Sequence, residues 1–171
     1  MKTPNKKILF LLFLLVLVAP LAALAKRPVR PKVDKIVVEK AERRMTLYQG
    51  NKVVKTYQVS LGKEPIGAKQ EQGDHKTPEG HYSIDARNPN SNYHRALHIS
   101  YPSARDREAA QARGVSPGGS VMIHGLPNSL PDFGAVHRLY DWTDGCIAVT
   151  NAEIEEIWDL VPNGTPIEIL P

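Results

Sequence analysis

The sequence contains a single cysteine, Cys146, among its 171 residues. A lone cysteine cannot form a disulfide within the chain, although exported proteins commonly use cysteines in pairs. Three roles remain open for it: a buried spectator, an intermolecular bridge or a reactive thiol. Composition alone favours the spectator, so the surroundings of Cys146 have to decide.

After the first 25 residues, basic and acidic residues are almost equal in number. Of the 22 basic residues, three lie within the first 25 positions, where there is no acidic residue. The remaining 19 basic residues stand against 18 acidic ones, a net charge of +1. This balance gives no indication of nucleic-acid binding. Repeats and heptads are missing as well, and the length fits one domain with a real core.

The N-terminus has the three parts of an export signal. A basic start is followed by the apolar run "ILFLLFLLVLVA" and by "ALA" at 23–25, a small-x-small cleavage pattern. We predict a signal peptide over residues 1–25, with cleavage near Ala25 and export to the periplasm or cell envelope. The alternative is a retained membrane anchor, since residues 8–25 are almost long enough to span a bilayer. No cysteine stands directly after the apolar run, where a lipid would be attached, and this excludes a lipoprotein.

Short strands dominate the first part of the remaining chain. Residues 26–32, "KRPVRPK", form a Pro-rich basic linker, so the domain is expected over 33–171. Alternating residues predict strands over 35–39, 44–49 and 52–60, with Val53, Tyr57 and Val59 supplying apolar positions in the last. The segment 62–80 is rich in glycine and almost free of large apolar residues, and it is predicted to be a surface loop.

Strands and two short helices alternate in the rest of the domain. "HYSIDAR" and "RALHISY" resume the strand pattern, with Ile84, Leu97 and Ile99 as core residues, and "SARDREAAQARG" predicts a helix with a Ser cap. "SVMIHG", "CIAV" and "PIEIL" predict further strands, and "AEIEEIWDLV" predicts a helix capped by Thr150 or Asn151. We expect a mostly β fold, a sandwich or barrel with two short helices.

At two of these strands, a residue whose side chain can take part in catalysis lies at the end or at the start. His124 is at the end of an apolar strand, before Gly125, and Cys146 is at the start of another, after Gly145. A thiol needs a base within hydrogen-bond reach to become a nucleophile near neutral pH, and imidazole suits that task. The backbone N–H groups of a glycine turn can also donate to an oxyanion. The alternative is that Gly145 only makes the turn.

No metal site or cofactor is predicted. His94 and His98 are four residues apart, but "YHRALHISY" reads as a strand. Residues at that interval on a strand are about 13 Å apart, which is too far for one ion.

The motifs, taken in order, resemble the L,D-transpeptidase catalytic domain, or YkuD domain, of bacterial enzymes that act on peptidoglycan. They are "VSLGKEPIGAKQEQGDHKTPEGHYSI", "LHISYP", "MIHG" and "TDGCIAV", within roughly residues 34–170. The resemblance implies a β-sandwich-like domain without cofactor. It also implies that Cys146 attacks the carbonyl of the L-centre of a diamino acid at stem-peptide position three and releases D-alanine. His124 would be the general base, oriented by the Gly125 backbone carbonyl.

The chain departs from the family pattern beside the cysteine. The family commonly has Ser/Thr-His-Gly-Cys followed by a hydrophobic residue and Arg or Asn, whereas this chain has Asp144 in place of the His and Ala148 in place of the Arg or Asn. The interval from His124 to Cys146 is also longer than usual. His137, in the longer loop, would either fill the space of the absent His or be solvated, and we expect it to be solvated.

Asp144 is a physical puzzle, because a nearby carboxylate raises the pKa of a thiol. Three explanations are open: it points away, it pairs with a cation such as His137 or Arg138, or it binds the ammonium of a diamino acid. Arg138 is also a candidate partner for substrate carboxylates. Tyr101, in "ISYP", would line the donor groove if the family pattern holds.

Two enzymatic functions and one non-enzymatic function follow from these residues. The first is an L,D-transpeptidase that uses a Cys146 thioester. The second is a hydrolase on the same scaffold, either an L,D-carboxypeptidase or an amidase that frees proteins from peptidoglycan. The third, a binding domain without activity, is disfavoured by the intact His124 and Cys146. Expected partners are peptidoglycan stem peptides, with an envelope protein as a further acceptor or substrate, and the chain is expected to be monomeric.

Overall fold

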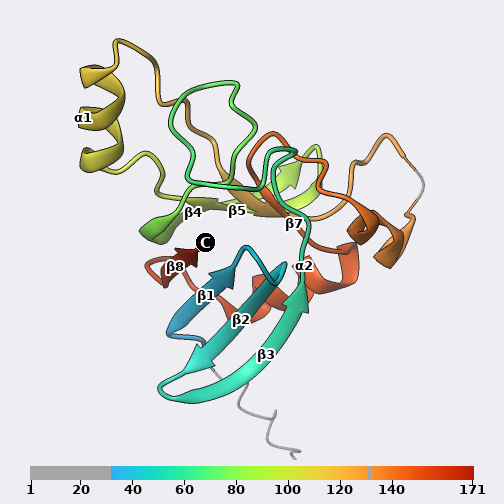
Figure 1. Cartoon of the computed structure of the whole chain (residues 1–171). Coiled ribbons are helices and arrows are strands. Elements are labelled where there is room, and N and C mark those ends of the chain that lie inside the picture. The colour runs from blue at the N-terminus through green and yellow to red at the C-terminus, as the bar shows by residue number, and fades with distance from the viewer. Residues whose placement is uncertain (1–31, 131) are drawn as a thin grey trace, which may run out of the picture.

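The computed structural model describes residues 32–130 and 132–171. Their strands form one curled sheet in the order β3-β2-β1-β8-β4-β5-β6-β7 (Figure 1). The prediction of a mostly β fold with two short helices is therefore confirmed. The predicted signal peptide lies outside the described residues. Within them, no helix is long and apolar enough to cross a membrane.

The first three strands form one edge of the sheet. β1 (Lys35–Glu39) and β2 (Arg44–Gln49) have the predicted bounds, and β3 is Lys52–Gln58. β2 pairs antiparallel with both β1 and β3, as expected for strands joined by short turns. Of the two apolar positions expected within β3, Tyr57 is buried in the core, whereas Val53 is 59% exposed.

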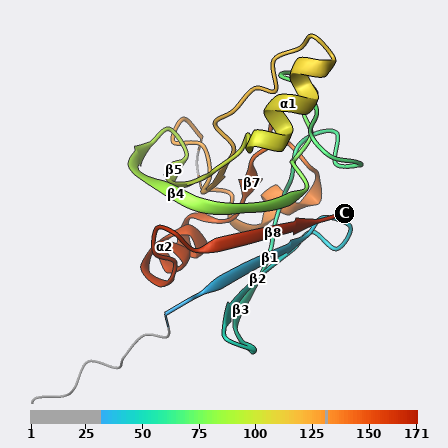
Figure 2. The ribbon, with the colours of Figure 1, turned by 90° about the vertical axis from the view of Figure 1, so that its left-hand side faces the viewer.

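The long strand β4 (Gly80–Ser91) joins the two halves of the sheet. Its first four residues pair with β8 (Pro166–Leu170), and its later residues pair with β5 (His94–Ile99). β8 also pairs with β1, in parallel. Seen from the side, β4 bends over β8, β1, β2 and β3, so that the sheet curls around its core (Figure 2).

The second half of the sheet ends in two very short strands. β6 (Met122–His124) is antiparallel to β5, and β7 (Ile147–Ala148) is parallel to β6. A six-residue 3-10 helix, η1 (Gly134–Leu139), lies in the loop between β6 and β7.

Two capped α-helices complete the fold. α1 (Ala104–Ala112) begins after Ser103, and α2 (Asn151–Leu160) begins after Thr150. Each cap hydroxyl accepts a hydrogen bond from the third helical N–H, and the acidic side chain at that position bonds back to the cap N–H. α2 packs against β5, whereas α1 stands apart from the sheet (Figures 1 and 2).

The core lies inside the curl of the sheet. The predicted core residues Ile84, Leu97 and Ile99 are fully buried. Side chains from both halves of the sheet and from α2 join them: Ile36, Val38, Met45, Leu47, Ile123, Ile147, Ile154, Ile157, Ile167 and Ile169. Burial of this apolar surface, at about 25 cal/mol per Å², is the main force that holds the short strands together.

A buried lysine fastens the glycine-rich loop of residues 62–79 to the sheet. Lys40, directly after β1, is only 2% exposed. Its ammonium group donates to the carbonyl oxygens of Gly67 (2.7 Å) and Thr77 (3.1 Å) and to Glu79 Oε1 (2.7 Å). All three donor positions are thus used, which offsets the cost of burying the charge.

Replacement of this lysine should destabilise the domain. We expect Lys40→Met to lower the free energy of unfolding by about 3 kcal/mol, because three polar groups of the loop lose a buried charged partner. Urea unfolding followed by circular dichroism measures the change. Lys35→Met is the matched control, because Lys35 pairs with Glu168 at 2.8 Å but is 47% exposed, and its loss should cost less than about 1 kcal/mol. Equal losses in the free energy of unfolding for Lys40→Met and Lys35→Met would contradict the stabilising role of Lys40.

Candidate active site

The topology of the sheet brings the predicted base and nucleophile together. His124 is the last residue of β6, and Cys146 directly precedes β7. These strands are adjacent and parallel, with Ile123 opposite Ile147. Both side chains line one pocket of about 450 Å³, at the edge of the sheet.

His124 is fixed in one orientation by its neighbour's backbone. Its Nδ1 lies 2.7 Å from the carbonyl oxygen of Gly125, as predicted from the family resemblance. A carbonyl can only accept, so Nδ1 carries the proton and the lone pair of the neutral ring is on Nε2. Residue 125 is tightly packed, since a Cβ there would lie 2.7 Å from Asn151 Oδ1. The imidazole is therefore prepared to take a proton at Nε2.

Two aromatic side chains shield this imidazole from water. The ring of Tyr93 is 4.5 Å from that of His124, centroid to centroid, and the ring of Trp142 is 5.7 Å away, edge on. Burial lowers the pKa of His124 to about 4, and the neighbouring His137 lowers it further, against the opposing effect of the Gly125 carbonyl. His124 is consequently neutral, and able to act as a base, throughout the physiological pH range.

The thiol of Cys146 is held in its protonated form. Its Sγ lies 3.7 Å from the carbonyl oxygen of Ser120, which can accept the thiol proton. Burial raises the pKa of the Cys146 thiol, and the charge of Asp144 adds to this, while a backbone hydrogen bond from Met122 opposes it. With a thiol of raised pKa and an imidazole of lowered pKa in one pocket, the two resting groups are neutral and do not form a thiolate and an imidazolium.

A neutral resting pair should be visible in the alkylation of the thiol. At pH 7 we expect iodoacetamide to modify Cys146 more slowly than free cysteine, because the thiolate is the reacting form. The rate should still be rising above pH of about 8.5, where an ordinary thiol is half ionised. Mass spectrometry of samples quenched at each pH measures this. A rate that is already maximal at pH 7 would show a preformed thiolate instead.

Asp144 contacts a lysine and a histidine, neither of them a residue considered as its partner from the sequence. Its Oδ1 lies 2.9 Å from Lys63 Nζ and 2.9 Å from His75 Nδ1, both on the glycine-rich loop. The hydrogen bond with Lys63 lowers the pKa of Asp144 the most. Of the explanations left open for Asp144, pairing with a cation is therefore the one the structure shows, and the cation is Lys63, not His137 or Arg138. The loop pattern of the sequence gave no signal that Lys63 and His75 would approach the cysteine.

Close backbone contact explains how the loop reaches the cysteine. A Cβ on Gly62 would lie 2.1 Å from the carbonyl oxygen of His75, and one on Gly145 would lie 2.6 Å from that of Lys76. Gly62 N–H also donates to the buried hydroxyl of Thr77, at 3.0 Å. The two glycines and the threonine of "TPEG" thus allow the loop to lie directly on the turn before Cys146.

Gly145 contributes a special backbone conformation. Its φ of 124° is unfavourable for other residues, and its N–H donates to Thr143 Oγ1 at 3.1 Å. Because this N–H is already engaged within the turn, the oxyanion role of Gly145 stays a prediction.

Three other candidate residues lie away from the pocket. His137 is fully buried, with Nδ1 3.1 Å from Ser60 Oγ, so the expectation of a solvated histidine was wrong. Its place behind His124 lets it affect the pKa of that base. Tyr101 is buried and donates to the Pro117 carbonyl at 2.9 Å, and Arg138 pairs with Glu153. None of the three lines the pocket.

A second pocket, of about 580 Å³, opens on the other side of the cysteine. It shares Ser120, Asp144 and Cys146 with the first pocket, and His75 lies on its wall. The thiol is therefore at the junction of two pockets, one that contains His124 and one that does not.

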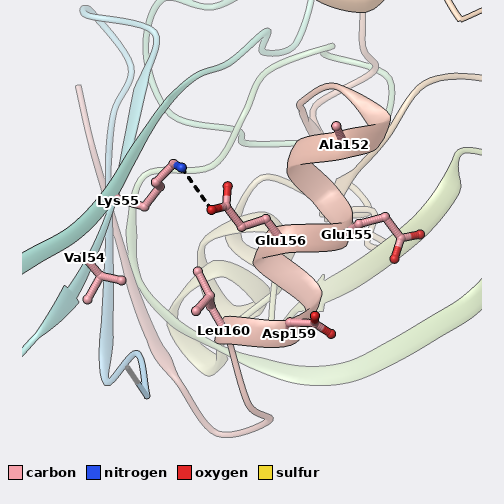
Figure 3. A pocket seen from close by; sticks show the side chains of 7 residues that line it. All are labelled: Val54, Lys55, Ala152, Glu155, Glu156, Asp159 and Leu160. Carbon is pink, nitrogen blue, oxygen red and sulfur yellow. Dashed lines mark hydrogen bonds and ion pairs between the residues drawn. The ribbon is translucent and has the colours of Figure 1, made fainter. Parts of the chain in front are cut away.

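The hollow between β3 and α2 has no such chemistry (Figure 3). Its acidic residues include Glu156, which pairs with Lys55 at 2.9 Å, and Glu155, which pairs with Arg95 at 3.1 Å. No cysteine, serine or histidine lines it. Within residues 32–130 and 132–171, no group of three metal-ligating side chains is suitably placed to hold an ion.

Comparison with known proteins agrees with this geometry. The family model of the YkuD L,D-transpeptidase catalytic domain matches residues 34–169. A relative from Escherichia coli (strain K12), named "Putative L,D-transpeptidase YafK", is 34% identical over 132 residues, 74% of this chain and 46% of YafK. The chain thus spans about half the length of this relative.

Solved structures show the same fold. The K307A mutant of Pgp2 from Campylobacter jejuni, a helical cell shape determining protein, superposes with a TM-score of 0.61 and 26% identity over 80% of this chain and 46% of that one. Bd1075 of Bdellovibrio bacteriovorus superposes with a TM-score of 0.57. It is 28% identical, and the match covers 81% of this chain and 48% of Bd1075. On the family match, the chain belongs to the YkuD family of L,D-transpeptidase catalytic domains.

Proposed function

We propose that the protein is a cysteine-dependent acyltransferase that acts on the stem peptides of peptidoglycan. The observation that carries this proposal is the position of Cys146 at the junction of two pockets, one of which holds a neutral imidazole with its lone pair on Nε2. A nucleophile, a base and room for two substrates are the requirements of acyl transfer.

The first half of the reaction forms a thioester. The Cys146 sulfur attacks the carbonyl carbon of the L-centre at stem position three, and His124 Nε2 takes the thiol proton as the C–S bond forms. The low pKa of His124 makes its imidazolium a strong acid, which returns the proton to the leaving nitrogen. The amide C–N bond then breaks, D-alanine leaves, and an acyl-enzyme remains.

The second half of the reaction transfers the acyl group. An acceptor amine approaches from the second pocket and attacks the thioester carbonyl. His124 takes a proton from the amine nitrogen and gives it to the departing sulfur, so that a new amide forms and the thiol is restored. If water enters in place of the amine, the same steps release a carboxylate. The walls of the second pocket therefore decide between transfer and hydrolysis.

Two further points support a site of action in the cell envelope. The first 25 residues have the pattern of an export signal, so we propose that the protein acts outside the cytoplasm. Pgp2, which shares the fold, is named as a determinant of cell shape. Peptidoglycan, whose stem peptides are the proposed substrate, is also part of the cell envelope.

Product analysis tests the proposal directly. The purified protein is incubated with disaccharide-tetrapeptide, and the products are separated by mass. A cross-linked dimer together with free D-alanine is the expected result. Tripeptide and D-alanine without a dimer would replace transfer by hydrolysis, with the thioester chemistry intact. If neither appears when an envelope protein or other amine is also supplied, the proposal is overturned.

A further inference from the structure

A second histidine lies on the wall of the second pocket. His75 lines this pocket of about 580 Å³, which shares Cys146 and Asp144 with the pocket that contains His124. Among the described residues that line the second pocket, His75 is the only histidine, and His124 is not one of them. Each of the two pockets that meet at Cys146 therefore has one imidazole on its wall.

The His75 ring is held in one tautomer by a carboxylate. Its Nδ1 lies 2.9 Å from Asp144 Oδ1. Asp144 is ionised near neutral pH, because its hydrogen bond with Lys63 lowers its pKa, so its oxygens can only accept. The proton of the neutral His75 imidazole is therefore on Nδ1, and the lone pair is on Nε2. Nε2 has no hydrogen-bond partner among the described residues, and the side chain is 44% exposed.

The backbone at His75 is strained and firmly held. Its φ of 54° is in the left-handed region, which is uncommon for residues other than glycine. The His75 carbonyl accepts from Glu64 N–H at 3.1 Å, and the Asp74 carboxylate before it accepts from Lys76 N–H after it, also at 3.1 Å. Backbone strain of this kind costs about 1–3 kcal/mol and is concentrated at functional sites. The loop thus presents the ring to the second pocket at an energetic cost.

The second half of acyl transfer needs a second base. Near neutral pH an acceptor amine is mostly an ammonium, since the pKa of a lysine-like amine is about 10.4, and an ammonium has no lone pair for attack. It must lose one proton before the attack and another as the amide forms. His124 Nε2 takes the later proton and gives it to the sulfur, so its single lone pair is not free for the earlier one. The pKa of His124, about 4, also makes it a weak base toward an ammonium.

We propose that His75 is the base that removes the first proton from the acceptor ammonium in the second pocket, with Asp144 as the positioning residue that fixes its tautomer. This inference rests on the proposed function and adds a second catalytic residue to it. The first proton goes to His75 Nε2 and from there to water, since the side chain is exposed. The freed amine forms the C–N bond, its second proton passes through His124 to the departing sulfur, and the third stays on the amide nitrogen.

A comparison of two nucleophiles tests the role of His75. The acyl-enzyme is formed from disaccharide-tetrapeptide and is offered, at pH 7, either a peptide amine, which is mostly protonated, or hydroxylamine, which is mostly uncharged. We expect His75→Asn to release D-alanine in the first turnover as fast as the wild type, but to transfer the acyl group to the peptide amine about 100-fold more slowly. Transfer to hydroxylamine should be equally fast in both proteins, because this nucleophile has no proton to lose before it attacks. Rapid-quench mass spectrometry measures each step.

The variants are chosen to spare the loop. Asparagine tolerates a positive φ better than most residues, so His75→Asn removes the imidazole and keeps the backbone. Asp144→Ala should slow transfer to the peptide amine by about tenfold and leave transfer to hydroxylamine unchanged, because the imidazole remains but its tautomer is no longer fixed. His81→Asn is the matched control, because His81 is an exposed histidine on a pocket that Cys146 does not line. It should keep all of these rates.

The outcomes separate this inference from the proposed function. Equal losses of His75→Asn with both nucleophiles would show that His75 only supports the loop, and unchanged transfer to the peptide amine would show that it takes no part. Either result overturns the inference and leaves the thioester chemistry intact, as does a wild type that hydrolyses the thioester and transfers to neither nucleophile. A wild type that releases no D-alanine overturns the proposed function itself, and the inference with it.

Discussion

Replacement of Cys146 by alanine is expected to reduce turnover of a stem tetrapeptide by roughly 10⁴-fold or more, because no other group in the pocket can form the thioester. The thiol is partly exposed, and its hydrogen bond to the Ser120 carbonyl is long, at 3.7 Å. Its removal should therefore change the free energy of unfolding by less than about 1 kcal/mol. Mass-resolved product formation and thermal unfolding of the same sample measure both quantities.

The base and the nucleophile should act as one unit. His124→Gln alone is expected to produce a comparable loss, and the double variant should be no slower than Cys146→Ala, since residues that act together are not additive. Activity of Cys146→Ala within tenfold of the wild type would exclude the thioester mechanism. Loss of activity accompanied by unfolding would show that the thiol has a structural role.

Replacement of Gly62 by alanine should be the most damaging change to the fold near the site. The added Cβ would lie 2.1 Å from the His75 carbonyl oxygen and 3.1 Å from the Gly145 Cα. Both are backbone atoms, which cannot rotate away, so the loop must separate from the catalytic turn. We expect a loss of about 4 kcal/mol or more in the free energy of unfolding, together with loss of turnover.

A second glycine provides the control for this prediction. A Cβ on Gly119 would have Pro102 Cδ as its nearest neighbour, at 3.9 Å, which is an ordinary contact. Gly119→Ala should therefore change the stability by less than about 1 kcal/mol. Urea unfolding of both variants measures the difference. Gly62→Ala with the stability of Gly119→Ala would show that the loop adapts without cost.

The strands were predictable where alternation and turns agree. β1 and β2 have the predicted bounds because apolar residues occupy alternate positions in both strands: Ile36 and Val38 in β1 and Met45 and Leu47 in β2 are buried. β4 is longer than expected, because it continues through Pro89 to Ser91. The register shifts between Asn88 and Ser91, and such an irregularity accommodates a proline in a strand. β3 is shorter, since Ser60 pairs with Ala148 instead.

The candidate site was predictable only in part, and the reason is physical. His124 and Cys146 are at strand ends, where sequence pattern locates residues well. Lys63 and His75 lie in a loop without periodicity, and only the close contact at Gly62 brings that loop to the cysteine. His137 was placed in solvent because loop sequences do not show which side chains turn inward, whereas its segment forms η1 and buries the ring.

The central position of β8 determines when this domain can fold during synthesis. β8 pairs with β1 on one side and β4 on the other, yet it is the last of the described strands to be made. Until the ribosome has released Pro166–Leu170, the β1–β3 ribbon and the β4–β7 half of the sheet have no shared edge. A nascent chain that stops short of β8 therefore lacks the strand that pairs with both halves of the sheet and leaves their apolar faces open, and such a chain is a natural target for chaperones and proteases.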